Sequence, residues 1–106
     1  MSVALMPPPQ RLSTLFRQLA DQWRSETRYL SSPTAIATHP AYQRIIGLGP
    51  QVIPHILGEM AAAPAQWFRA LLALTGETPV PDADRGDVTA MTAAWQDWGR
   101  ANGWIG

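Results

Sequence analysis

Apolar residues recur at steps of three and four along the first third of this chain, which is the spacing of a helix that buries one face. The stripe comprises Leu12, Leu15, Phe16, Leu19, Trp23 and Leu30. It predicts a helix over about residues 11–30. Residues 31–33, Ser-Ser-Pro, end this helix, because proline disfavours helical geometry in the residue before it and serine side chains compete for backbone hydrogen bonds. We expect a turn there.

A second, short helix is predicted to begin at Pro40. Proline suits the first turn of a helix, and Thr38 or His39 can cap the backbone N–H groups that have no partner inside the helix. Gly47 ends this helix, because glycine readily adopts the backbone conformation that closes a helix.

The stretch from residue 45 to residue 76 reads as two apolar helices bracketed by glycines. The first restarts at Pro50, and Pro64 separates it from the second, which ends at Gly76. The second is apolar around most of its circumference, as is usual for the central helix of a domain. Residues 50–75 are therefore predicted to form a helical hairpin in the core.

The last helix is predicted over about residues 88–101, after a loop at residues 77–87 that is rich in Pro, Asp and Gly. Asp87 is its expected N-cap. Its apolar face carries Val88, Met91, Trp95 and Trp98. The chain beyond this helix, with Trp104, is expected to fold back. These elements together predict an all-α fold, a compact bundle of about five helices.

Length and N-terminal composition set the expected domain organisation. A chain of 106 residues is in the usual range of one domain. Three prolines at residues 7–9 favour an extended conformation, so we expect residues 1–10 to form a flexible Pro-rich arm and residues 11–106 a single helical domain. No segment has the pattern of a signal peptide, and none approaches the roughly 20 apolar residues of a membrane span. We expect a cytoplasmic protein that has no contact with a membrane.

The predicted hairpin resembles a HEAT or armadillo-type helical repeat, through Leu48 and Gly49 before its first helix and residues 70–76, ALLALTG, at its end. A single unit of this kind cannot form a solenoid, so it must close its core as a small bundle. A longer pattern, HPAYQRIIG at residues 39–47 with WFRALLALTG at residues 67–76, resembles a family of small, uncharacterised, all-helical bacterial proteins. This resemblance implies the fold and no activity.

Charge and composition exclude several kinds of chemistry. Eight arginines balance eight acidic residues and lysine is absent, so no net charge steers the chain toward nucleic acid or anionic lipid. Guanidinium groups favour planar contacts at interfaces, but a general compositional bias toward arginine is the favoured explanation for the absence of lysine. Cysteine is absent, which excludes disulfides, thiolate nucleophiles and zinc sites built on sulfur.

No set of residues is arranged for catalysis or for metal binding. His39 and His55 are the only histidines, and their spacing fits no pair of ligands on one helix. The carboxylates at residues 82–87 lack the glycine and the final glutamate of a calcium loop, and a phosphate-binding loop needs a lysine. We therefore predict no metal, no cofactor and no enzymatic activity.

Aromatic and arginine residues indicate a binding surface. The five tryptophans are the most unusual feature of the composition, and those on helical faces are explained by packing in a small core. Trp104 lies beyond the last helix, where it would act as an anchor for a partner or as a lid over the bundle. His39 is either a recognition group or a helix cap. The predicted partner-binding residues are His39, Tyr42, Gln43, Arg44, Trp67, Arg69 and Trp104.

These features predict a protein-binding or adaptor module that acts through a helical groove, with an antitoxin-like or regulatory role as one form. The alternative is an accessory protein for nucleic acid, a partner that the neutral charge disfavours. It would use the arginines of the first helices, Arg17, Arg24, Arg28 and Arg44. Homo-oligomers are also left open.

Overall fold

The computed structural model describes residues 9–60 and 64–106, which form an all-α fold, as predicted. The α-helices of the described residues are α1 (Pro9–Thr27), α2 (Pro33–Ala37), α3 (Pro40–Gly47), α4 (Ile53–Glu59), α5 (Pro64–Thr75) and α6 (Val88–Ala101). Two short 3-10 turns, η1 (Pro50–Val52) and η2 (Asp82–Asp84), precede α4 and α6. None of the helices within these residues is long and apolar enough to cross a membrane.

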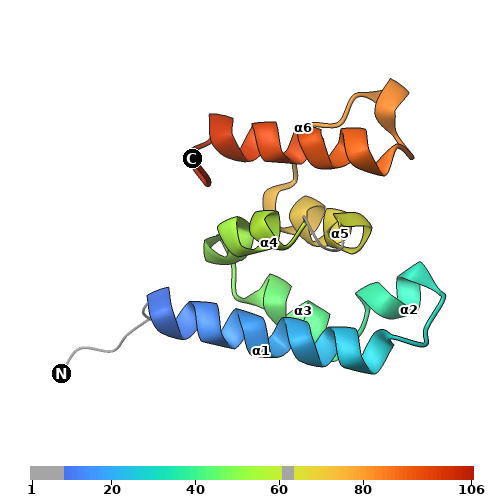
Figure 1. Cartoon of the computed structure of the whole chain (residues 1–106), viewed down its shortest axis with the longest axis vertical. Coiled ribbons are helices and arrows are strands. Elements are labelled where there is room, and N and C mark those ends of the chain that lie inside the picture. Colours follow the sequence, from blue (N-terminus) through green and yellow to red (C-terminus); the bar gives the residue numbers. More distant parts are fainter. Residues whose placement is uncertain (1–8, 61–63) are drawn as a thin grey trace.

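The helices lie in three layers (Figure 1). The first layer contains α1, α2 and α3, the middle layer α4 and α5, and the third layer α6 alone. Helix α5 packs against α2, α3, α4 and α6, so the helix with the largest apolar circumference is central, as predicted. One face of the middle layer is thus covered by three helices and the other face by one.

A cluster of aromatic rings joins the first layer to the middle layer. The ring centroid of Trp67 on α5 lies 4.9 Å from that of Trp23 and 5.7 Å from those of Phe16 and Tyr42. All four side chains are almost completely buried. Aromatic side chains bury the largest apolar areas of any residues, so this cluster is the main source of packing energy on this face.

The N-terminal helix differs from its prediction at both ends. Helix α1 begins at Pro9, inside the predicted arm, because proline is tolerated at the first helical position. Residues 1–8 of that arm lie outside the described residues. The helix ends at Thr27, and the backbone N–H of Leu30 closes a turn on the carbonyl of Thr27. Leu30 is 45% exposed, so it does not belong to the buried stripe.

A short helix that the sequence pattern did not predict follows the turn after α1: residues 33–37 form α2. The Oγ of Ser32 accepts a hydrogen bond from the backbone N–H of Ala35 at 3.2 Å, and Pro33 occupies the first helical position. Ser32 and Pro33, which were predicted to end α1, instead start α2, because α1 already ends at Thr27. Ile36 and Ala37 of this helix are buried.

The other helix limits agree with the sequence patterns. Helix α3 begins at Pro40, α6 spans the predicted residues, and Asp87 caps α6 by accepting a hydrogen bond from the N–H of Ala90 at 3.1 Å. Gly76 ends α5 with φ 68°. The helices predicted for the hairpin are present as η1 with α4, and α5, while their link at residues 61–63 lies outside the described residues. The likeness to a HEAT-type repeat stays a prediction.

Candidate functional site

His39 acts as the helix cap that the sequence offered as one of two alternatives. Its Nδ1 accepts a hydrogen bond from the N–H of Ala41 at 3.0 Å, and its Nε2 lies 2.9 Å from Oε1 of Glu26. Because Nδ1 accepts, the ring proton lies on Nε2, which donates to the carboxylate. Both ring nitrogens are occupied by the chain's own groups.

Tyr42 and Trp67 do not lie on a partner-binding surface, which corrects their assignment from the sequence. Only 1% of Tyr42 and none of Trp67 is exposed. The Tyr42 hydroxyl donates to the carbonyl of Gln66 at 2.6 Å and accepts from the N–H of Ala70 at 3.0 Å, and burial raises the pKa of Tyr42 to about 12. The groove predicted beside α3 is therefore filled by these aromatic rings, which hold α3 against α5.

The remaining predicted residues are spread over the molecule. Gln43 is exposed and its Nε2 donates to the carbonyl of Ala37 at 2.8 Å, while Arg44 and Arg69 are exposed on α3 and α5. Trp104 follows α6 along the chain, and α6 itself lies in the layer farthest from α3 (Figure 1). It is half-buried and packs against the core, which agrees with a lid rather than a free anchor.

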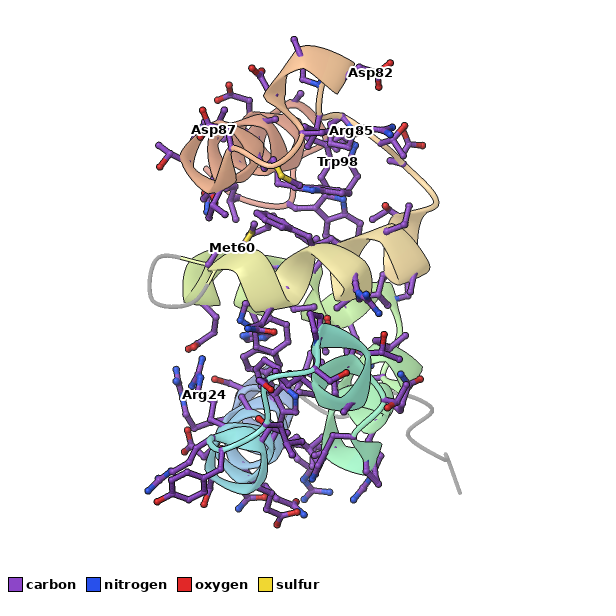
Figure 2. All side chains as sticks on the ribbon, turned by 90° about the vertical axis from the view of Figure 1, so that its right-hand side faces the viewer. Arg24, Met60, Asp82, Arg85, Asp87 and Trp98 are labelled. Atoms are coloured by element: carbon purple, nitrogen blue, oxygen red, sulfur yellow. The ribbon has the colours of Figure 1, made fainter. Side chains whose placement is uncertain are left out.

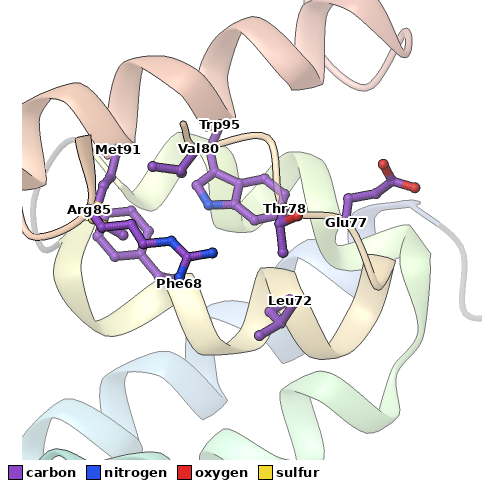
Figure 3. A pocket seen from close by; sticks show the side chains of 8 residues that line it. All are labelled: Phe68, Leu72, Glu77, Thr78, Val80, Arg85, Met91 and Trp95. Atoms are coloured by element: carbon purple, nitrogen blue, oxygen red, sulfur yellow. The ribbon is translucent and has the colours of Figure 1, made fainter. Parts of the chain in front are cut away.

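An open groove lies between α5 and α6, on the face of the middle layer that a single helix covers. We call it the α5–α6 groove; its volume is about 380 Å³. Its lining residues are Phe68, Leu72, Glu77, Thr78, Val80, Arg85, Met91 and Trp95 (Figure 3). Leu72 is 49% exposed, and it adjoins the other apolar side chains of the groove, so its exposed surface is part of a continuous apolar patch.

The groove exists because α5 has apolar residues on two sides. Trp67 and Leu71 face the aromatic core and are fully buried, whereas Phe68 and Leu72, one position further along the chain, line the groove. Helix α6 contributes Trp95, which is buried, but it does not cover Leu72. The apolar circumference was visible in the sequence, but which of its sides stays open depends on how many helices cover each.

Opposite charges lie at the two ends of the α5–α6 groove. Arg85 and Glu77 stand on either side of the apolar lining (Figure 3). The Nε of Arg85 lies 3.3 Å from Oδ1 of Asp82, so the positive charge at this end already has a counter-charge. Both members of that pair are mostly exposed, and such pairs contribute little to stability.

A second, shallower hollow of about 600 Å³ lies along α6, next to the loop that follows α5. We call it the acidic hollow. Two carboxylates line it, those of Asp84 and Asp97. Its other lining residues are small or apolar: Pro79, Pro81, Ala90, Ala93, Ala94, Trp98 and Ala101. Pro79 and Pro81 border this hollow and Val80 borders the groove, so the same short segment separates the two depressions.

Charge is separated along the molecule although the chain as a whole is neutral. Up to residue 75 the chain contains six arginines and three acidic residues, and from residue 77 onward two arginines and five acidic residues, so the formal charges are +3 and −3. Asp82 and Asp87 lie beside α6, whereas Arg24 lies at the opposite end (Figure 2). We call residues 77–106 the acidic segment; both depressions border on it.

The basic part of the chain has an internal counter-charge that the sequence did not reveal. Glu59 at the end of α4 accepts hydrogen bonds from Arg17, at 2.7 Å, and from Arg24. Burial opposes ionisation of Glu59, but the hydrogen bonds and charges of the two arginines outweigh it and lower its pKa. Two of the four arginines predicted as phosphate contacts are therefore already paired.

No group of three or more His, Cys, Asp or Glu side chains in the described part of the chain is placed to hold a metal ion. Comparisons of the chain with models of protein families, with curated proteins and with solved structures gave no match. The role of the groove is therefore inferred from its own residues.

Proposed function

We propose that this protein is a protein-binding module whose docking surface is the α5–α6 groove. The observation that supports the proposal is the half-exposed side chain of Leu72, which lines the same groove as Phe68, Trp95 and Met91. The aromatic cluster on the other side of α5 is, by contrast, almost completely buried. Open apolar surface rimmed by polar groups is typical of protein interfaces, and aromatic residues and arginine supply most of their binding energy.

The module acts by binding and not by catalysis. His39, one of the predicted partner-binding residues, is a helix cap. The polar residues that line the groove are Glu77, Thr78 and Arg85, and the rest of its lining is apolar. An adaptor or a regulator fits these features, for example a protein that neutralises its partner as an antitoxin does. A cytoplasmic location remains part of this proposal.

The test is a pull-down from the source cells with the tagged wild-type chain, Leu72→Arg and Ala73→Arg. Ala73 is exposed on the same helix and does not line the groove, so both variants add the same charge and only one blocks the groove. We expect a stoichiometric partner that wild type and Ala73→Arg capture and that Leu72→Arg loses at least about tenfold, which corresponds to about 1.4 kcal/mol. Equal capture by all three would refute the groove as the docking surface.

Nucleic-acid binding is the second candidate, and the charge separation is the observation in its favour. Arg28 and Arg44 are exposed in the basic part of the chain, while Arg17 and Arg24 are engaged by Glu59. Fluorescence anisotropy with labelled DNA and RNA at low salt decides it. A signal that disappears in Arg28→Glu and weakens with salt would support this candidate, and a flat trace would remove it.

A further inference from the structure

The shape of the α5–α6 groove fits a helix. Each of its walls carries apolar residues four positions apart, Phe68 and Leu72 on α5 and Met91 and Trp95 on α6. Residues at this spacing lie about 6 Å apart along a helix axis. The ridges on the surface of any helix have the same period, so a third helix can interdigitate with both walls.

The charge around the groove favours a basic occupant. The groove is bordered by the acidic segment, whose formal charge is −3. Arg85 is the positive group at the rim, and Asp82 compensates it at 3.3 Å. Glu77 stands at the other end of the groove, and Asp84 lies across the segment that separates the groove from the acidic hollow. Long basic side chains can reach these carboxylates while their stems cover apolar surface.

We infer that the partner presents a cationic amphipathic helix, whose apolar face enters the α5–α6 groove and whose Lys or Arg side chains meet Glu77 and Asp84, since Asp97 of the acidic hollow already pairs with Arg100 at 2.9 Å. This inference rests on the proposed function and adds the class of the partner. Its physical basis is complementarity of shape with the two apolar walls and of charge with the acidic segment. Such complementarity accelerates association and selects among helices with similar apolar faces.

The test uses two fluorescent peptides of about 18 residues, long enough to form a helix. They share leucines at helical spacing on one face, and carry lysine in one peptide and glutamate in the other on the polar face. Binding is measured by anisotropy at low ionic strength and at about 0.15 M salt, where charges are screened beyond roughly 8 Å. We expect the lysine peptide to bind at least about tenfold more tightly at low salt, with a smaller ratio at higher salt.

Variants locate the binding. Leu72→Arg should abolish binding of the lysine peptide, and Ala73→Arg, with the same added charge, should retain most of it. Removing two carboxylates with Glu77→Gln and Asp84→Asn should lower the preference for lysine by at least about threefold. Asp21→Asn also removes a negative charge, but on the exposed surface of α1 in the basic part of the chain, and should leave the preference unchanged.

The outcomes separate the inference from the proposed function. If both peptides bind equally and Leu72→Arg abolishes both, the groove is a docking surface but its occupant is not selected by positive charge, and the inference is wrong. If neither peptide binds and the pull-down does not depend on Leu72, both the inference and the proposed function are wrong. Sedimentation velocity adds a further check: a dimer that disappears in Leu72→Arg would make a second copy of the chain the occupant and overturn the inference.

Discussion

The two faces of the α4–α5 layer differ in how completely they are covered. On one face α1, α2 and α3 bury Trp67 among three other aromatic rings, with no exposed surface left. On the other face α6 alone leaves Phe68 half-buried and Leu72 half-exposed. Both faces belong to the same apolar helix, α5. The number of helices that cover a face therefore determines whether its apolar residues form core or a binding surface.

The sharpest test of this comparison uses Trp67 and Phe68, which are adjacent in α5; Trp67 packs in the closed aromatic core and Phe68 lines the open groove. We expect Trp67→Ala to lower the free energy of unfolding by about 3–5 kcal/mol, because it leaves a large cavity in a closed core. Phe68→Ala should cost about 1 kcal/mol, because its ring is already partly in water. Urea denaturation measures both. Similar losses would mean that the groove is as much a part of the core as the aromatic cluster is.

Within the closed face, two buried tryptophans differ in hydrogen bonding. Trp23 Nε1 donates to the carbonyl of Ile36 at 2.9 Å, while Trp67 Nε1 is buried with no hydrogen-bond partner among the described residues. Both positions lose a similar volume on replacement by phenylalanine, so the difference reports the hydrogen bond. We expect Trp23→Phe to destabilise the protein by about 1–2 kcal/mol more than Trp67→Phe, measured by urea denaturation. A larger loss for Trp67→Phe would contradict this reading.

Local signals in the sequence predicted the limits of α3 and α6 and the end of α5 well. The caps at His39 and Asp87 and the stop at Gly76 depend on neighbouring residues only, so they can be read without the fold. Helix α2 was missed because Ser32 and Pro33 were interpreted as the end of α1, whereas α1 ends at Thr27 and these two residues start α2. A Ser-Pro pair with Ile36 and Ala37 behind it was the available signal.

The candidate site could not be located from the sequence, because it depends on distant parts of the chain. Tyr42 and Trp67 were assigned to a surface that α1 in fact covers. The partners of Glu59 are separated from it by 35 and 42 residues. The groove likewise combines α5 with α6 and the loop between them. Helical periodicity shows that a face is apolar, and only packing shows which apolar face stays open.

Two substitutions at His39 distinguish its role as a helix cap from the alternative role of a group that recognises the partner. His39→Ala should lower the free energy of unfolding by about 1 kcal/mol, because the N–H of Ala41 loses its acceptor. His39→Asn should recover most of this loss, because asparagine is a good N-cap. Thermal unfolding measures both variants, and the pull-down should give the same partner for each. A His39→Asn chain that is stable but captures no partner would show instead that the imidazole recognises the partner.

The smallest expected change in the free energy of unfolding comes from removing ion pairs, one between the first and middle layers and one on α6. Glu59 binds Arg17 and Arg24 with only 12% of its side chain exposed, whereas Asp97 and Arg100 form a pair at 2.9 Å on the exposed surface of α6. We expect Glu59→Gln to cost about 1 kcal/mol at neutral pH, and Asp97→Asn less than about 0.5 kcal/mol. The difference follows from the weaker screening of a carboxylate that is mostly out of water.

The dependence on pH gives the Glu59 pair its own signature. The pKa of Glu59 is lowered below its ordinary value of 4.5 in the folded state, so ionisation of this carboxyl group stabilises the folded state. Its stabilisation is complete above the ordinary pKa and is lost as the pH falls through the lowered one. The gap in unfolding free energy between wild type and Glu59→Gln, measured by urea denaturation, should therefore close in acid. A gap that persists below the lowered pKa as well would mean that Glu59 stabilises the first layer by packing rather than by charge.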